Sequence, residues 1–153
     1  MIISLNMHQP AFYWAVFALI RNEEGQILFS RRSNTCHLDG YLSLPAWHVE
    51  AGEYLTDAMK RELSEEIWIQ VTDLRLICSQ QSRHRGDEET YFNFYFQINA
   101  YSGRINNNEK DRCSDLIFLS LEDAQRDLCV PYVWVALESV AAWEDLSEIV
   151  WSL

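Results

Sequence analysis

The sequence predicts an α/β domain in which a mixed sheet carries helices on both faces. Segments with strand-like alternation of apolar residues lie before, between and after segments with helical spacing. The chain has 153 residues, which is the length of one domain, and 48% of them are hydrophobic, which is enough for a sizeable core. We therefore expect residues 1–153 to form a single domain.

Five segments are predicted to be strands because they are rich in β-branched and aromatic residues. They are residues 12–20, 26–30, 71–80, 90–98 and 116–119. A turn over residues 22–25 separates the first two, so these are expected to form a hairpin. In residues 90–98 the alternation is regular, with one face of phenylalanines and the other of Tyr91, Asn93 and Tyr95.

Three helices are expected between and after these strands. Leu55, Met59, Leu63 and Ile67 have helical spacing, which predicts a helix over residues 54–67. Ser120 is followed three residues later by an acid, which is typical of the start of a short helix. Proline at position 131 suits the first position of a last helix, which continues to about residue 143.

The charge of the chain limits its partners. Lys and Arg number 12 against 23 Asp and Glu, so the formal charge is −11, which disfavours a surface that binds nucleic acid. Small phosphorylated ligands are still possible, because bound divalent metal ions reverse the charge of a site locally. We see neither an apolar run of the ~18–20 residues that cross a membrane nor a signal peptide. The four cysteines contain no C-x-x-C pair, so we expect a cytoplasmic protein with free thiols.

The chemistry is expected in residues 47–69, WHVEAGEYLTDAMKRELSEEIWI, which contain six acidic residues. Glu62 and Glu66 lie one helical turn apart, and Glu65 lies beside Glu62. Such like-charge pairs destabilise a helix by about 0.2–0.5 kcal/mol each. A hard divalent cation, Mg²⁺ or Mn²⁺, relieves this repulsion. The carboxylates alone favour the ordinary alternative, which is a solvated acidic face of a helix.

The order of the surrounding residues resembles the Nudix hydrolase family, whose 23-residue box reads G-x5-E-x7-R-E-U-x-E-E-x-G-U, where U is aliphatic. Glu53 matches the first acid, Arg61-Glu62-Leu63 the R-E-U, and Glu65-Glu66 the paired acids; Ile69 matches the last U. Leu44-Pro45 also precedes the box as in the family. This resemblance implies a Nudix-type α/β/α sandwich with a central mixed β-sheet.

Two tryptophans depart from the family pattern. Trp47 takes the place of the first glycine, and Trp68 that of the second. The first glycine lets the loop approach the metal closely, and the second ends the helix in a left-handed conformation. A residue with a Cβ in that conformation costs roughly 1–2 kcal/mol. Trp68 should therefore change the end of the helix or offset the strain by burying its indole. Trp47 either packs outward or narrows the site.

The resemblance also implies metal ligands and a network that supports them. Glu62, Glu65, Glu66 and the backbone carbonyl of Ala46 are expected to coordinate Mg²⁺ or Mn²⁺. Arg61 is expected to pair with Glu53 and hold the loop against the helix. The simpler interpretation of Arg61 is a surface salt bridge, which contributes little to stability.

The catalytic and substrate-binding residues follow from the same resemblance. A carboxylate must take a proton from the attacking water, and Glu62 and Glu109 are both candidates for this general base. Glu109 lies in the polar loop over residues 106–114, where a solvated acid is an equal possibility. Arg32 stands where relatives often contact phosphate, although a plain surface cation is equally consistent with the sequence. His48 is expected to be structural rather than catalytic.

The favoured function is a metal-dependent pyrophosphohydrolase that cleaves a nucleoside diphosphate linked to another group. Within this class we favour nucleoside triphosphates as substrates, giving a monophosphate and pyrophosphate. The alternative is a Nudix-fold nucleotide-binding or regulatory module with weakened or lost catalysis, which Trp47 and Trp68 suggest. A third reading is an acidic interaction domain without a ligand site. The aromatic-rich C-terminal helix also suggests a possible homodimer.

Overall fold

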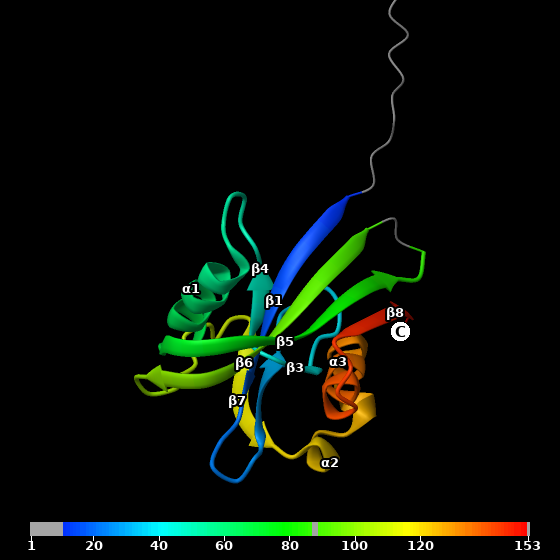
Figure 1. The fold of residues 1–153 in the computed structure, drawn as a ribbon. Coiled ribbons are helices and arrows are strands. Elements are labelled where there is room, and N and C mark those ends of the chain that lie inside the picture. The colour runs from blue at the N-terminus through cyan, green and yellow to red at the C-terminus, as the bar shows by residue number, and fades with distance from the viewer. Residues whose placement is uncertain (1–10, 87–88, 153) are drawn as a thin grey trace, which may run out of the picture.

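The computed structural model describes residues 11–86 and 89–152, and its strands form two sheets (Figure 1). One described sheet has the order β4-β1-β6-β5-β8 and the other β3-β2-β7. The strands are β1 (Phe12–Ile20), β2 (Ile27–Arg32), β3 (Leu42–Ser43), β4 (Ala46–His48), β5 (Gln70–His84), β6 (Thr90–Ser102), β7 (Cys113–Leu119) and β8 (Leu146–Trp151). The five-stranded sheet is mixed, because β1 pairs with β6 and β5 with β8 in parallel, while the other pairs are antiparallel.

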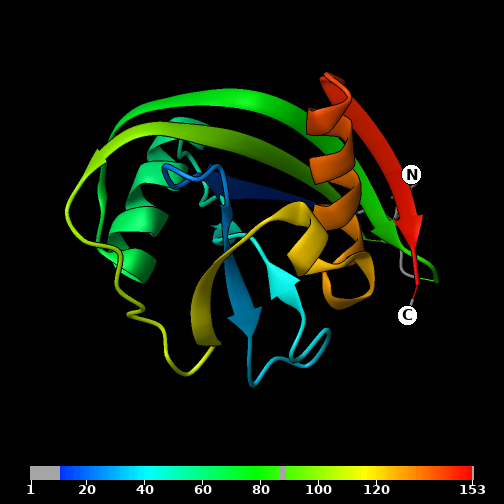
Figure 2. The same cartoon turned by 90° about the horizontal axis from the view of Figure 1, so that it is seen from below.

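Two longer helices pack on opposite faces of the five-stranded sheet (Figures 1 and 2). Alternate side chains of β1 point to the two faces. Val16 and its neighbours on one face contact the apolar side of α1 (Leu55–Ile67). Phe17 and Leu19 on the other face belong to the cluster that includes α3 (Pro131–Ala141). The predicted α/β/α sandwich with a central mixed sheet is therefore confirmed.

The expected hairpin of the first two strands is wrong. β1 and β2 are joined by a turn and one isolated bridge, between Arg21 and Ile27, and then enter different sheets. The reason lies in the other strands, since both edges of β1 are taken by β4 and β6. β2 instead pairs with β3 and β7, so the two sheets diverge from this turn.

The three predicted helices are present, and they end close to the expected residues. The side chain of Ser120 accepts a hydrogen bond from the backbone of Asp123 and caps α2 (Leu121–Ala124), as predicted. A 3₁₀ turn, η1 (Arg126–Leu128), then leads to α3. Strand β8 was not expected from the sequence, since its residues do not form a regular apolar run. No helix within the described part of the chain is long and apolar enough to span a membrane.

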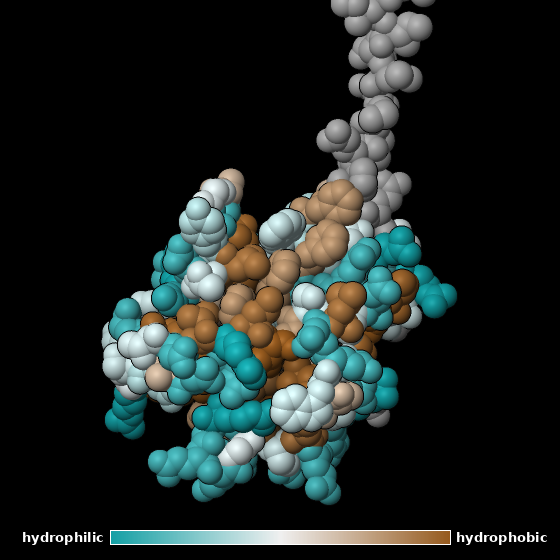
Figure 3. Space-filling model, in the orientation of Figure 1, coloured by the Kyte–Doolittle hydropathy of each residue, from teal (hydrophilic) through white to brown (hydrophobic). Residues whose placement is uncertain are grey.

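One part of the sheet face beyond α1 exposes large apolar side chains (Figure 3). Phe12 is 55% exposed, Trp14 50% and Leu76 47%. Cysteines of the described residues are free thiols, of which Cys78 and Cys129 are buried. A homodimer stays a prediction of the sequence.

Candidate functional site

Helix α1 positions the acidic side chains of the box. Ala58, Met59, Leu63 and Ile67 are buried against the sheet and fix the rotation of the helix. Glu62 and Glu66 therefore lie beside this apolar side, one turn apart. Glu62 is only 3% exposed and Glu66 is partly buried, whereas Glu65 is exposed. The solvated acidic face that the carboxylates alone favoured does not describe Glu62 and Glu66.

The helix ends at Trp68 in the left-handed conformation, with φ 63° and ψ 32°. Its backbone N–H donates to the carbonyl of Leu63, and the N–H of Ile69 donates to the same carbonyl at 3.2 Å. The expectation that burial of the indole offsets the strain is wrong, because Trp68 is 59% exposed. The backbone of Trp68 lies close to Gly103: a Cβ atom added to this glycine would lie 2.8 Å from the Trp68 carbonyl oxygen.

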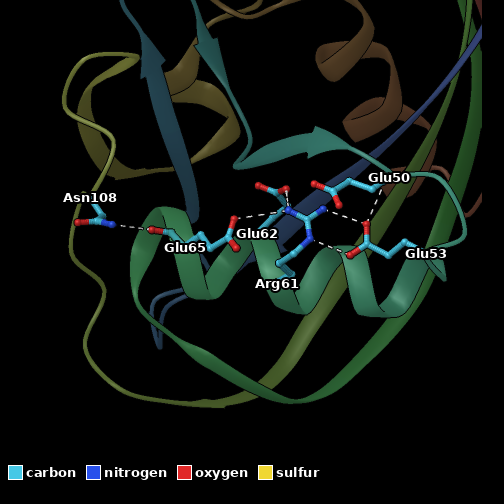
Figure 4. A network of polar contacts seen from close by, with 6 residues as sticks. All are labelled: Glu50, Glu53, Arg61, Glu62, Glu65 and Asn108. Carbon is cyan, nitrogen blue, oxygen red and sulfur yellow. Dashed lines mark hydrogen bonds and ion pairs between the residues drawn. The ribbon is translucent and has the colours of Figure 1, made fainter.

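Arg61 is the centre of a network that joins the loop before α1 to the helix (Figure 4). Its Nε and Nη2 donate to the two carboxylate oxygens of Glu53, at 2.7 and 2.9 Å. Its Nη1 contacts Glu62, and reaches Glu65 at 3.5 Å. Glu53 also accepts the backbone N–H of Glu50 at 3.1 Å. The pairing of Arg61 with Glu53 that the resemblance implies is present; their catalytic role stays a prediction.

A loop of three asparagines closes the end of α1. The backbone N–H groups of Asn106 and Asn108 donate to the carbonyls of Ile67 and Glu66, at 3.1 and 2.9 Å. The side chain of Asn108 donates to the carbonyl of Glu65 at 2.9 Å (Figure 4). These bonds satisfy carbonyls that the end of a helix leaves without partners. They also fix the start of the segment that carries Glu109 next to Glu66.

Burial and like charges act together on these carboxylates. Burial, helped by the charges of Glu109, Glu62 and Glu65, raises the pKa of Glu66 to about 8, against a small opposing effect of Arg112. Burial also raises the pKa of Glu62, although Arg61 opposes it. The hydrogen bonds from Arg61 lower the pKa of Glu53. The site therefore concentrates negative charge around Glu66, and a bound cation would offset the repulsion between these carboxylates.

The donor set suits a hard divalent cation, since carboxylate and carbonyl oxygens are the ligands of Mg²⁺ and Mn²⁺. In the arrangement of the described side chains, however, no three or more His, Cys, Asp and Glu residues form a group that holds a metal ion. One carboxylate oxygen of Glu62 contacts Arg61. The fit to a cation rests on the donor chemistry and on the raised pKa of Glu66.

A pocket of about 660 Å³ opens next to the acidic cluster. Glu66 and Glu109 line it together with Ala46 and Arg32, while Glu53, Arg61, Glu62 and Glu65 do not. Arg32 ends β2, where a shift of register separates it from Arg31. Its Nη2 donates to the carbonyl of His37 at 3.2 Å, and its buried Nε has no hydrogen-bond partner among the described residues. Arg32 thus brings a positive charge to the pocket that Glu66 and Glu109 also line.

The inner wall of the pocket is polar as well as aromatic. Asn93 donates to Gln80 at 3.1 Å and to Ser82 at 2.9 Å, and Gln80 donates to the carbonyl of Tyr132 at 2.9 Å. The ring of Phe17 stacks on Tyr95 with 4.7 Å between centroids. Asn93 and Ser82 line the pocket, so a ligand there meets fixed polar groups beside aromatic faces.

Arg112 is a pocket residue that the sequence analysis missed. Its guanidinium lies over the ring of Trp47, with Cζ 4.8 Å from the centroid. Trp47 lines the pocket and is only partly exposed, so it packs beside the acidic cluster and does not point away from it. A basic residue three positions after Glu109 was the available signal. It gave no reason, however, to expect contact with a residue so far back in the chain.

The comparisons with known proteins agree with this geometry. A model of the NUDIX domain matches residues 12–143. The chain is 39% identical over 51 residues to the 8-oxo-dGTP diphosphatase of Escherichia coli, a match covering 33% of this chain and 40% of that protein. It is 34% identical over 74 residues to the NAD-capped RNA hydrolase NudC of Vibrio parahaemolyticus, covering 48% and 27%. The matches thus span well under half the length of these curated relatives.

Solved structures extend the similarity to nearly the whole chain. A MutT NUDIX hydrolase from Burkholderia pseudomallei aligns with a TM-score of 0.75 at 25% identity, over 83% of this chain and 96% of that one. A MutT protein from Methanosarcina mazei Go1 aligns with a TM-score of 0.75 over 88% and 96%, and its 23% identity supports the fold alone. Since the domain model covers most of the chain and includes the acidic helix and its loop, this chain belongs to the NUDIX family.

Proposed function

We propose that this protein is a divalent-metal-dependent pyrophosphohydrolase that cleaves a nucleoside diphosphate linked to another group. The observation that carries the proposal is a pocket of about 660 Å³ that Glu66 of α1 and Glu109 line together with Arg32. A pocket that contains both acids and a cation suits a ligand whose phosphates carry the charge. The volume lies in the range of small-molecule sites.

In this proposal Glu62, Glu65, Glu66 and the carbonyl of Ala46 hold Mg²⁺ or Mn²⁺. The bound ions lower the pKa of water and stabilise the charge that develops on the leaving phosphate. Glu62 and Glu66 are preorganised by the rotation of α1, and Glu65 lies at the exposed edge of the cluster.

The remaining residues support the helix, transfer a proton or bind the substrate phosphates. Arg61, bound to both oxygens of Glu53, holds the loop before α1 against the helix and contacts Glu62. We assign Glu109 as the general base, because it lines the pocket, whereas Glu62 does not line it and contacts Arg61. Arg32 lines the pocket and contributes its guanidinium to a phosphate oxygen.

Nucleoside triphosphates are the proposed substrates, with monophosphate and pyrophosphate as products. The similarity to the 8-oxo-dGTP diphosphatase supports this choice. The formal charge of −11 disfavours long nucleic acids as substrates. We therefore expect a panel to show higher kcat/KM on nucleoside triphosphates than on NAD-capped RNA.

The experiment measures pyrophosphate release from this panel with Mg²⁺ or Mn²⁺, comparing the unmodified protein with Glu66→Gln. Glu23→Gln, in the exposed turn after β1, is the matched control because it removes the same charge far from the pocket. We expect Glu66→Gln to lower kcat by a factor of about 100 or more, by analogy with the loss of a positioned metal or proton group. No turnover of any nucleotide by folded protein would leave the alternative, a nucleotide-binding module without catalysis.

A further inference from the structure

We propose that Arg112, held on the ring of Trp47, binds a phosphate group of the substrate. The inference rests on the proposed function, because it adds a substrate-binding residue to the same pocket. Arg112 lies in the loop that follows Glu109 and lines the pocket together with Glu66 and Glu109. The family pattern gives this role to neither residue: Arg112 lies outside the box, and Trp47 occupies the place of the first glycine of the box.

The position of the guanidinium is fixed by the stack. Cζ of Arg112 lies 4.8 Å from the centroid of the Trp47 ring. Trp47 itself belongs to β4 and is paired with Val16 of the central strand β1, so its backbone is part of the five-stranded sheet. A cation over the face of an indole is attracted by the ring, and more strongly when water is excluded. The long arginine side chain is thus restrained before a ligand arrives.

The backbone on both sides of Arg112 is also anchored. The N–H of Arg112 donates to the carbonyl of Glu109 at 2.9 Å, and its carbonyl accepts the N–H of Ser33 at 2.9 Å. The side chain of Asn34 donates to the carbonyl of Asp111 at 2.8 Å. This turn is therefore tied to Ser33 and Asn34, which directly follow Arg32 at the end of β2. Restraining a charged group in this way reduces the conformational entropy that binding would cost.

The donors of Arg112 are available. Within the described residues its guanidinium has no hydrogen bond or ion pair, although the chain carries an excess of acids. Arg61, by contrast, is occupied by three carboxylates. Stacking uses the face of the guanidinium and leaves its N–H groups free in the plane. Planar, forked donors match the oxygens of a phosphate, and a stacked arginine directed into a pocket is suited to that group.

This arrangement gives Trp47 a role. In this position glycine offers no side chain, whereas the indole provides a platform for a cation beside the acidic cluster. The pair balances the negative charge of Glu66 and Glu109 with a positive charge on the same pocket. Arg112 would then bind a phosphate in the same pocket that Glu66 and Glu109 line.

The test compares Arg112→Ala with Lys110→Ala, which removes an exposed cation two residues earlier that does not line this pocket. We measure binding of inorganic pyrophosphate by calorimetry with Mg²⁺ present, and KM and kcat for the best substrate of the panel. Arg112→Ala is expected to weaken pyrophosphate binding and raise KM by about tenfold or more, as the loss of a charged hydrogen bond implies. Lys110→Ala should change both by less than twofold, and Arg112→Lys should give an intermediate loss because lysine lacks the fork.

Trp47 supplies an independent arm of the test. Trp47→Gly removes the platform and should reproduce much of the Arg112→Ala loss, while the double variant should be no weaker than Arg112→Ala alone. Trp47→Phe, which keeps an aromatic face, serves if the glycine variant does not fold. Unchanged pyrophosphate binding and KM in Arg112→Ala would overturn the proposal, and so would an equal loss in Lys110→Ala. A protein that hydrolyses no nucleotide but binds pyrophosphate through Arg112 would support this inference while refuting the proposed hydrolase.

Discussion

Replacing Glu66 by Gln should stabilise the metal-free protein while it lowers kcat. The carboxylate of Glu66 is partly buried beside Glu109, Glu62 and Glu65, and its pKa is raised from 4.5 to about 8. An amide of the same shape keeps the packing but carries no charge. The substitution therefore relieves a repulsion that metal ions are proposed to relieve in the native protein.

The magnitude follows from the shift of the pKa. In the unfolded chain the carboxyl group loses its proton near pH 4.5, whereas in the folded protein it keeps it until about pH 8. The folded state thus binds more protons in this window, so the free energy of unfolding falls as pH rises from 4.5 to 8. At 1.36 kcal/mol per pKa unit the full effect approaches about 4–5 kcal/mol. Because the side chain keeps some contact with solvent, we expect about 1–3 kcal/mol.

The assay is urea unfolding of both proteins from pH 4 to pH 8.5 in EDTA. Glu66→Gln should equal the unmodified protein near pH 4 and exceed it by about 1–3 kcal/mol at pH 8. Added Mg²⁺ should narrow or reverse this difference in the free energy of unfolding, because only the unmodified protein is stabilised by binding it. At a Mg²⁺ concentration of 100 times Kd the stabilisation is about 2.7 kcal/mol. A pH-independent difference, or a variant that is less stable at pH 8 without metal, would refute this account of the site.

Three further substitutions test other parts of the structure. Trp68→Gly should raise the free energy of unfolding by about 1 kcal/mol, because glycine adopts the left-handed conformation without strain and the indole is largely exposed; urea unfolding measures it, and an unchanged or lower value contradicts it. Leu63→Ala should lower that free energy by about 2–5 kcal/mol, since Leu63 is fully buried under the sheet; a loss below 1 kcal/mol would show that α1 is not packed as described. Glu53→Gln should lower kcat/KM about tenfold, because it releases Arg61. Asp57→Asn, on the exposed first turn of α1, is the control and should leave kcat/KM unchanged. Equal effects of the two variants would assign the loss to the charge of the helix alone.

The parts of the fold that depend on local pattern could be predicted from the sequence. The period of Leu55, Met59, Leu63 and Ile67 fixed which side of α1 faces the sheet, and hence the placement of Glu62 and Glu66 beside it. The cap at Ser120 was also predictable, because its partner lies only three residues away. Where the determining contacts are this local, the spacing of residues is sufficient.

Features set by distant contacts could not be predicted in this way. The separation of β1 from β2 depends on β6, which lies some seventy residues further along the chain and occupies the edge of β1. Trp68 keeps its left-handed conformation while largely exposed, and its carbonyl lies against Gly103, where a side chain would collide. The stack of Arg112 on Trp47 likewise joins segments that no local pattern relates.

The central claim is that the carboxylates of α1 bind a divalent metal ion that a substrate diphosphate shares. The most direct measurement is anomalous diffraction from a crystal soaked in Mn²⁺ and a non-hydrolysable nucleotide. We predict a manganese peak within coordination distance of the Glu66 carboxylate, with Glu62 turned away from Arg61 to join it and a phosphate on the opposite side of the ion. A well-ordered crystal with nucleotide in the pocket and no manganese near Glu66 would contradict the account.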